Sequence, residues 1–222
     1  MNPLCKIKNN YSKTYNTFVK THFLKPGDNK KIIEKLTTIF LEDDDLHIAV
    51  AYFNSEYFAN LIINRAKKKL KTLLILNTSD IIRPKEAGKS EIVISNALIR
   101  ILKEERDYIF CKSLGLRISG NYQNMHHKFL FTKNKLFFGS LNLTDAAINR
   151  NFESIIETDN KFLIREFYSE FGKLWNIASE LYSDKEGKLR SIMCPKCENS
   201  DGVDFESFGL ICHMCGYNFI ID

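Results

Sequence analysis

Apolar residues in the first half of the chain occur in two kinds of pattern. Residues 46–53 (LHIAVAYF) and 72–78 (TLLILNT) are short apolar runs, of the length of strands that are buried on both faces. An amphipathic helical pattern covers residues 32–40, and a second one follows Ser55, a suitable helix N-cap. We predict strands over the two runs and helices over the two patterns.

The rest of the chain continues this alternation. Helical patterns cover residues 90–110, with Cys111 expected to be buried at the end of that helix, and residues 162–181. Strand patterns cover residues 114–120, 125–132, 135–139 and 152–159. Because strands and helices alternate, crossover connections are expected. We therefore predict an α/β fold with a mixed, largely parallel sheet flanked by helices.

Composition fits a globular protein, since 44% of the residues are apolar and 12% are aromatic. The sequence lacks the run of roughly 18 apolar residues that a membrane-spanning helix requires. Its first residues, MNPLCKIKNN, lack the apolar core of a secretory signal. We therefore expect no membrane span and a cytoplasmic location.

Charge divides the chain into unequal parts. Through Ser191 there are 31 Lys and Arg against 22 Asp and Glu, whereas from Ile192 onward there are one and five. We predict a basic main domain over 1–182, a polar linker over 183–191 and an acidic unit over 192–222. The basic domain favours a polyanionic partner, either nucleic acid or an acidic lipid surface. The basic cluster from Arg65 to Lys71 is itself expected to be a solvated helix end.

Four cysteines lie in the acidic unit as two CxxC pairs: Cys194, Cys197, Cys212 and Cys215. This spacing is typical of a zinc ribbon, in which four thiolates hold a tetrahedral Zn²⁺ with no open position for catalysis. Two disulfides are the alternative, although they belong to secreted proteins. We predict a structural Zn²⁺ and no catalytic metal. The acidic unit is expected to contact a partner protein, a base edge or a second copy of the chain.

The candidate chemistry lies in the stretch MHHKFLFTKNKLFFGSLNLT. On a strand, His126 and Lys128 share one face and His127 the other. A three-residue loop before the next strand would place Lys128 opposite Ser140 and His126 opposite Asn142, whereas a two-residue turn would put them out of phase. We favour the first. Imidazole, ammonium and amide groups in one place suit phosphoryl chemistry, although a single strand histidine is more often a packed core residue.

A family resemblance rests on three motifs: His126-x-Lys128, Gly139-Ser140-x-Asn142 and Asn151-Phe152-Glu153. Together they resemble the phospholipase D superfamily, the HKD phosphodiesterases. The resemblance implies that His126 is a nucleophile or a general acid. It also implies that Lys128 and Asn142 bind phosphate, that Ser140 and Gly139 support them, and that Glu153 orients the histidine. In this family two such histidines act in one site without a metal, through a phosphohistidine.

Two departures from the family pattern shape the prediction. The family motif HxKxxxxD expects Asp at position 133, where this sequence has Lys133, which we place at a turn facing away from His126. The sequence also carries one HxK and no internal repeat, so a complete site requires two chains and implies a two-fold homodimer. Single-motif members of the family are mostly nucleases.

We therefore predict a homodimeric, metal-independent endonuclease whose partner is nucleic acid, with DNA favoured over RNA. A lipid phosphodiesterase is the second hypothesis, and an exposed apolar face would favour it. The third hypothesis is a nucleic-acid-binding or scaffold protein that keeps the fold without turnover.

Overall fold

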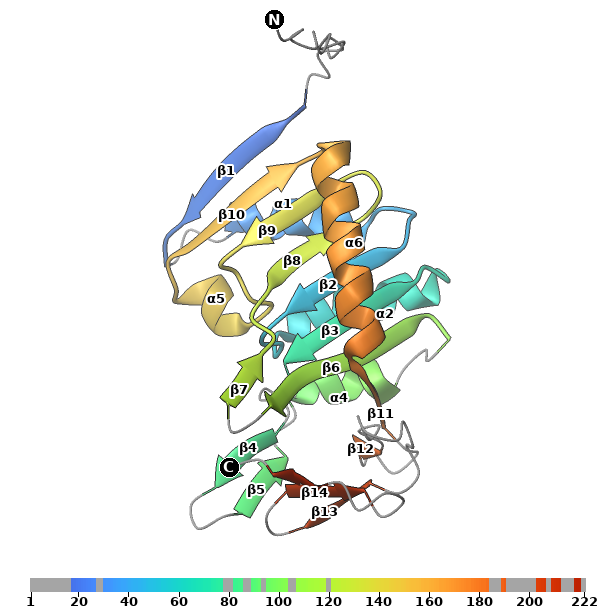
Figure 1. The fold of residues 1–222 in the computed structure, drawn as a ribbon. Coiled ribbons are helices and arrows are strands. Elements are labelled where there is room, and N and C mark those ends of the chain that lie inside the picture. Colours follow the sequence, from blue (N-terminus) through green and yellow to red (C-terminus); the bar gives the residue numbers. More distant parts are fainter. Residues whose placement is uncertain are drawn as a thin grey trace, which may run out of the picture.

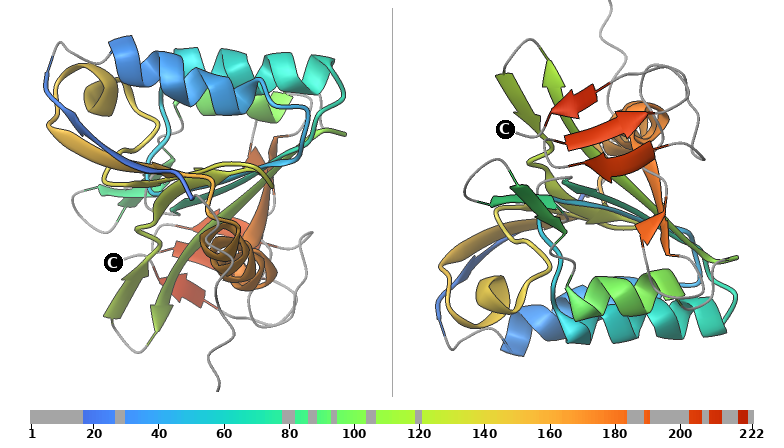
Figure 2. Two further views of the ribbon diagram at one scale, coloured as in Figure 1. Left: turned by 90° about the horizontal axis from the view of Figure 1, so that it is seen from above. Right: turned by 90° about the horizontal axis from the view of Figure 1, so that it is seen from below.

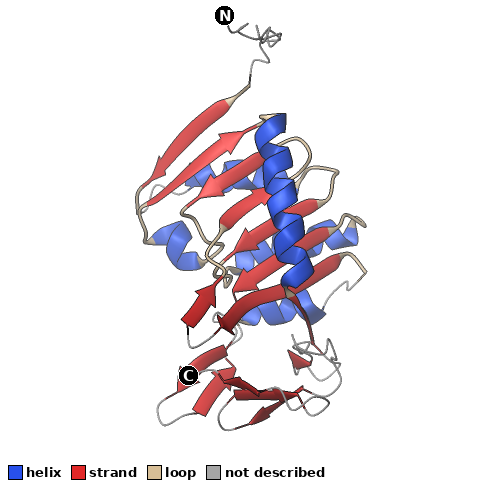
Figure 3. Cartoon of the chain, viewed as in Figure 1, coloured by secondary structure: helices blue, strands red, loops and turns tan. Residues whose placement is uncertain are grey.

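The computed structural model describes residues 17–26, 30–77, 82–85, 89–92, 95–103, 107–118, 121–183, 189–190, 203–206, 209–212 and 218–220. One large sheet runs through the main domain, with helices on both of its faces (Figures 1 and 3). In spatial order its strands are β1 (Val19–Leu24), β10 (Glu153–Thr158), β9 (Leu136–Gly139), β8 (Lys128–Phe131), β2 (Leu46–Val50), β3 (Thr72–Asn77), β6 (Ile109–Ile118), β11 (Ser179–Ser183) and β12 (Leu189–Arg190), with β7 (Asn121–Asn124) paired to β6.

Two helical layers enclose the sheet. On one face lie α1 (Lys30–Phe40), α2 (Glu56–Lys67) and α4 (Asn96–Lys103), and on the other lies α6 (Lys161–Ile177) (Figure 2). A short helix, α5 (Asp145–Asn149), precedes β10. The mixed sheet and its flanking helices confirm the predicted fold class. Parallel pairing is narrower than predicted, because among the described strands the parallel ladders are β2–β3 and β3–β6, and the other ladders are antiparallel.

The central strand β2 explains the continuous apolar run in the sequence. Ile48 and Val50 pack into the core under α1, α2 and α4, whereas Ala49 belongs to the core under α6. All five residues of β2 are buried. The strand is therefore covered on both faces, as its lack of alternation predicted.

The predicted helix over residues 90–110 is confirmed over α4 and is wrong at both of its ends. Among the described residues its apolar spacing is realised in α4, and β5 (Lys89–Ile92) precedes that helix in a hairpin with β4 (Ile82–Lys85). From Ile109 the chain joins β3 in parallel, so Cys111 lies in strand β6 and not in a helix. Pairing with an adjacent buried strand overrides helical spacing here. Burial raises the pKa of the Cys111 thiol to about 12.

The ends of other elements also differ from the predictions. Helix α6 stops at Ile177, because residues 179–183 form β11 against β6. Strand β8 begins at Lys128, three residues later than predicted. The edge strand β1 was not predicted, because its burial alternates only weakly. It pairs with β10, where Glu157 accepts hydrogen bonds from His22 Nε2 at 3.0 Å and from Lys35 Nζ at 3.3 Å.

The C-terminal part is described only in its strands. Within the predicted linker, Leu189–Arg190 forms β12 and pairs with β11. Beyond it, β13 (Val203–Glu206), β14 (Gly209–Cys212) and β15 (Asn218–Ile220) form a three-stranded antiparallel sheet. The predicted zinc ligands Cys194, Cys197 and Cys215 lie outside the described residues, and of Cys212 only the backbone is described. None of the helices among the described residues is both long and apolar enough to span a bilayer.

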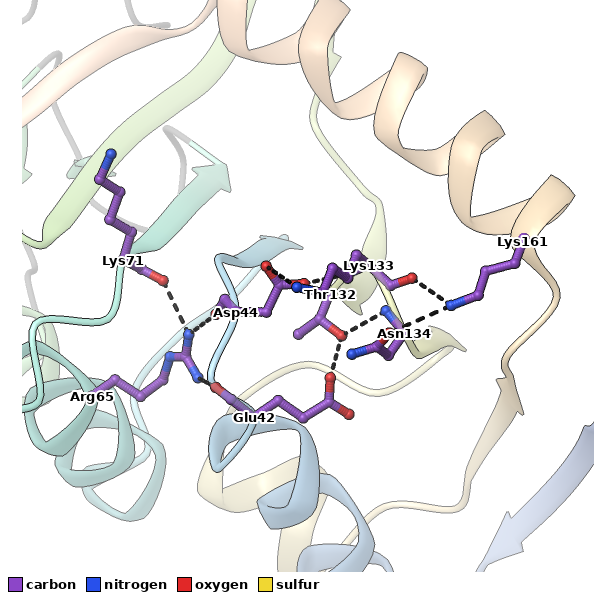
Figure 4. Close-up of polar contacts among 8 residues, drawn as sticks. All are labelled: Glu42, Asp44, Arg65, Lys71, Thr132, Lys133, Asn134 and Lys161. Carbon is purple, nitrogen blue, oxygen red and sulfur yellow. Dashed lines mark hydrogen bonds and ion pairs between the residues drawn. The ribbon is translucent and has the colours of Figure 1, made fainter.

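A buried arginine holds the connection between α1 and β2. Arg65 is 2% exposed, so the prediction of a solvated helix end is wrong for this residue. Its guanidinium donates to the carbonyl oxygens of Glu42 at 2.8 Å, Asp44, and Lys71 at 3.2 Å (Figure 4). It also donates to the carbonyl oxygen of Phe40 at 3.0 Å. The carbonyl groups compensate the burial of the charge.

The same connection holds the turn between β8 and β9. Asp44 accepts a hydrogen bond from Lys133 N at 3.0 Å, and Glu42 accepts one from the Thr132 hydroxyl (Figure 4). Thr132 N donates to Lys135 O at 2.9 Å, so the loop has two residues and the predicted three-residue loop is wrong. Asp44 also lies 3.7 Å from the Lys133 ammonium, so a carboxylate from another segment stands beside the position where the family has one.

We expect Arg65→Met to lower the free energy of unfolding by about 3 kcal/mol, because several buried carbonyl groups lose a charged donor. Urea denaturation followed by circular dichroism measures this. Lys67→Met, on the exposed side of the same helix, is the matched control and should change it by less than about 0.5 kcal/mol. Equal effects of the two substitutions would contradict the role given to Arg65.

Candidate active site

The motif residues meet at one edge of the sheet, where β2 and β9 end and β8 and β10 begin (Figure 1). Antiparallel pairing produces this convergence. Val50 lies opposite Lys128, and the β8–β9 register brings Lys128 next to Gly139. Gly139 in turn lies opposite Ile155 in β10. The loops that carry His126, Ser140, Asn142 and Glu153 therefore gather at a common edge.

Strand β9 approaches β10 closely at Gly139. A Cβ atom built on Gly139 would lie 2.0 Å from the carbonyl oxygen of Ser154, which is far inside contact distance. Ser140 N donates to that same oxygen at 2.9 Å. The glycine therefore lets the chain turn out of β9 while Ser140 remains bonded to β10.

The candidate nucleophile precedes its strand. His126 is exposed and lies in the segment before β8 that has no regular structure. Its carbonyl oxygen accepts a hydrogen bond from Lys128 Nζ at 2.8 Å. The lysine thus fixes the main chain that carries the histidine. His127 lies toward α6: its ring lies 5.5 Å from that of Phe129, and its Nε2 lies 4.0 Å from Glu170 in α6.

Lys128 is partly buried among apolar side chains. It lines a small pocket together with Leu36, Leu130, Phe137, Leu141 and Ile155. Burial lowers the pKa of Lys128, and the negative charge of Glu153 opposes part of this effect. An anionic oxygen in front of this ammonium would offset its desolvation. Lys128 is therefore suited to bind a phosphate oxygen.

Glu153 is the buried acceptor of a small hydrogen-bond network. It is 9% exposed, and it accepts from the Ser140 hydroxyl and from Asn151 Nδ2, the latter at 3.2 Å. Ser154 N donates to Ser140 Oγ at 2.9 Å. In the single chain the carboxylate thus binds Ser140 and Asn151. Among the described residues, no hydrogen bond joins Glu153 to His126, which is the contact that the resemblance implied. Glu153 fixes the loop after β9 to the start of β10.

Asn142 is fixed by the loop after β2. Its Oδ1 accepts from Tyr52 N at 3.2 Å, and the neighbouring Leu143 O accepts from Asn54 N and Ser55 N, each at 3.2 Å. Because the β8–β9 register puts Lys128 beside Gly139, the predicted pairings of Lys128 with Ser140 and of His126 with Asn142 are wrong. Because Oδ1 already has a donor, the amide nitrogen is the group left to donate to a ligand.

The loop at Tyr52 and Asn54 was missed by the sequence reasoning. Asn54 Oδ1 accepts from Asp145 N at 3.0 Å, so this loop also fixes the start of α5. Helix α5 is capped by Thr144, whose Oγ1 accepts a hydrogen bond from Ala147 N at 3.1 Å. The available signal was polar residues directly after a buried strand, since such positions lie at the edge of a sheet.

These groups provide the chemistry of phosphoryl transfer. An exposed imidazole can attack phosphorus, and a partly buried ammonium with an oriented amide can stabilise charge on the non-bridging oxygens. The carboxylate network positions the loops and leaves the ammonium available. The motif residues of the sequence analysis therefore lie together, although through contacts other than those expected.

Curated relatives match part of the chain. The chain is 49% identical over 71 residues to the mitochondrial cardiolipin hydrolase of Danio rerio, and 42% identical over 52 residues to that of Homo sapiens. These matches cover 30% and 23% of this chain, and 31% and 21% of the relatives. The chain thus aligns with less than a third of either protein.

Solved structures share the fold over a larger part of the chain. NucT from Helicobacter pylori superposes with a TM-score of 0.59 at 19% identity, covering 72% of this chain and 98% of NucT. The phospholipase D family member Nuc from Salmonella typhimurium has a TM-score of 0.56 at 16% identity, covering 75% and 99%. At these identities the likeness establishes the architecture.

A family model covers most of the main domain. The model described as "Cardiolipin synthase, PLD-like domain" matches residues 36–175, from α1 through α6, and so includes the three motifs and the strands that carry them. The family match, the fold and the convergence of the motifs at one sheet edge agree. The chain therefore belongs to the phospholipase D-like family of phosphodiesterases.

Proposed function

We propose that this protein is an endonuclease that cleaves phosphodiester bonds of nucleic acid without a catalytic metal, as a homodimer. The observation that carries the proposal is the position of His126, exposed at the sheet edge that also presents Lys128 and Asn142. The histidine supplies a nucleophile, and the two other side chains supply donors for phosphate.

The chemistry proceeds in two steps. In the first, a ring nitrogen of His126 forms a bond to phosphorus while the bond to the leaving oxygen breaks. The departing alkoxide takes a proton from a second histidine. In the second, that histidine removes a proton from water, whose oxygen displaces His126 from phosphorus. Lys128 and Asn142 stabilise the negative charge on the non-bridging oxygens in both steps.

The second histidine comes from a second copy of the chain. The sequence holds one HxK motif, so a chain alone carries half of the acid–base pair. A two-fold axis near His126 would bring both histidines to one phosphate. The exposure of His126 is consistent with this arrangement, because a site completed by a partner must be accessible to it.

Nucleic acid is the favoured substrate because of charge. The chain through Ser191 carries an excess of nine positive charges, and a polyanion gains from such a surface. We propose DNA, in preference to RNA, as the substrate. We also propose that the protein acts in the cytoplasm. Single-motif members of the family, which this sequence resembles, are mostly nucleases.

A lipid phosphodiesterase is the second candidate, and exposed aromatic residues favour it. Phe152, directly before Glu153, is 76% exposed, and Phe23 in β1 is 81% exposed. Phe23 lies opposite Ser154, so both rings belong to the edge of the sheet that carries the site. Such rings could enter a lipid surface. The relatives named as cardiolipin hydrolases make cardiolipin the first lipid to test.

We expect the native protein to cleave labelled DNA in EDTA and His126→Ala to lose at least a thousandfold in rate, because the nucleophile is removed. Labelled single- and double-stranded DNA and RNA, and vesicles containing cardiolipin, form the panel. His127→Ala is the matched control and should lose less than about tenfold in rate, because its ring takes no part in the bond changes at phosphorus. Cleavage of cardiolipin alone would replace the first candidate by the second. Binding of nucleic acid without cleavage of any substrate would favour an inactive binding protein.

We expect Ser140→Ala to lower kcat about tenfold with little change in KM, because Glu153 and the backbone of Ser154 each lose a partner that holds the loop. Hydrolysis of a nitrophenyl phosphodiester measures this independently of the natural substrate. Ser154→Ala is the control, since Ser154 contributes only backbone groups to the network. Equal loss in both variants would contradict the positioning role of Ser140.

We also propose that Cys194, Cys197, Cys212 and Cys215 hold a structural Zn²⁺. The purified protein should contain about one zinc per chain, and Cys197→Ala should lose it and unfold at lower temperature. Cys111→Ala, at a buried thiol in β6, is the control and should retain zinc. Elemental analysis measures the zinc content, and thermal denaturation measures the unfolding temperature. Full zinc content in Cys197→Ala would contradict the ribbon.

A further inference from the structure

A cavity of about 210 Å³ is lined by His126 and by the last turn of α6. That end of α6 is the lower one in Figure 1. The walls of the cavity come from the end of β7, the segment before β8, strand β6 and the last turn of α6. They consist of Leu114, Asn124, Met125, His126, Leu174 and Ile177, with His127 at the rim. We propose that this cavity is a nucleobase subsite, which takes the base of a nucleotide attached to the scissile phosphate. This inference rests on the proposed nuclease function.

The floor of the cavity is apolar and firmly built. Met125 is 4% exposed and Leu174 is 9% exposed, and both belong to the core under α6. Leu114 packs against the same core from β6. Ile177, the last residue of α6, is 62% exposed and forms the outer lip. A ligand in this cavity therefore meets apolar surface below and at one side.

Polar groups stand on the side that faces the reaction. His126 and His127 lie along the rim, and Asn124 lies at the end of β7. Asn124 Oδ1 accepts from Asn77 Nδ2 at 3.4 Å, which directs the amide oxygen toward Asn77. The amide nitrogen of Asn124 then serves as a donor for the ligand.

A nucleobase matches this combination of surfaces. Its two faces are apolar and its edge carries hydrogen-bond acceptors, so the floor can take a face and Asn124 can meet the edge. The thioether of Met125 makes favourable contacts with aromatic rings. The cavity is smaller than the roughly 300–1,000 Å³ typical of sites for larger organic ligands, so it suits a single ring system.

An acyl chain fits less well. It gains free energy in proportion to the methylene groups that it buries, so it needs a long apolar trench. This cavity is short, and its reacting side is polar. A phosphate group does not suit the apolar floor, and the candidate phosphate ligand Lys128 belongs to a different pocket. The base next to the bound phosphate is the part of a nucleotide that fits both the apolar floor and the polar side of the cavity.

The position of the cavity restricts the substrate. A base can enter beside His126 only if it is not stacked and paired within a duplex. The structure therefore points to a strand that is single at the cleaved linkage, with one adjacent base held in the cavity.

The test uses a labelled single strand of one repeated nucleotide with a single abasic residue. Cleavage at every linkage is resolved on a sequencing gel, so the distant linkages are internal controls. We expect at least about a fivefold lower rate at one of the two linkages that flank the abasic residue, since stacking of a base contributes ~1–3 kcal/mol. Equal cleavage at all linkages would overturn the subsite while leaving the nuclease function standing. No cleavage anywhere would remove both.

Variants connect that result to the cavity. In Asn124→Ala/Ile177→Ala, rates at ordinary linkages should fall toward the rate at the abasic position, so the difference between them narrows to less than about threefold. Phe162→Ala removes an equally exposed apolar side chain from the other end of α6 and should keep the native difference. A double variant with the native difference would show that the base binds elsewhere and would overturn the assignment.

Discussion

The geometry of the site depends on the hydrogen bonds between the buried guanidinium of Arg65 and the carbonyl groups around it. A guanidinium in the interior must be met by acceptors, and here the connection between α1 and β2 folds around it so that its carbonyl groups supply them. That connection then carries Glu42 and Asp44 to the turn between β8 and β9. This β8–β9 turn sets the register that puts Lys128 beside Gly139. A charge far from the reacting groups thus determines where they stand.

The site itself divides its polar groups between support and chemistry. Glu153, whose negative charge acts on the pKa of Lys128, is engaged by Ser140 and Asn151 through hydrogen bonds. The ammonium bonds instead to a carbonyl oxygen of its own segment. A direct Lys–Glu ion pair would reduce the attraction of the lysine for phosphate. Holding the carboxylate with neutral donors keeps the loops in place without that loss.

How far the sequence predicted the structure depended on whether the signal was local. The continuous apolar runs at 46–50 and 72–77 identified strands covered on both faces. The motifs predicted His126, Lys128 and Asn142 as site residues because the chemistry restricts residue type. The loop length after Thr132 was not predictable in this way. Both turn lengths are compatible with Lys133 and Asn134, and the choice is made by Glu42 and Asp44, which lie far away in sequence.

Other errors have the same physical origin. A run of charged residues after α2 resembled a solvated helix end, and only the carbonyl groups that surround Arg65 explain its burial. Residues 109–110 fitted a helical period, but the neighbouring strand β3 provided pairing partners. The edge strand β1 alternates too weakly to be recognised without β10. In each case the deciding partner is distant along the chain.

The close approach at Gly139 has a consequence for how this family member can vary. Every amino acid that a single nucleotide change can produce from a glycine codon has a Cβ atom, and that atom would collide with the carbonyl oxygen of Ser154. No neutral first step away from glycine exists there, unless β9 and β10 separate. Backbone geometry therefore keeps glycine at position 139, whatever the substrate is.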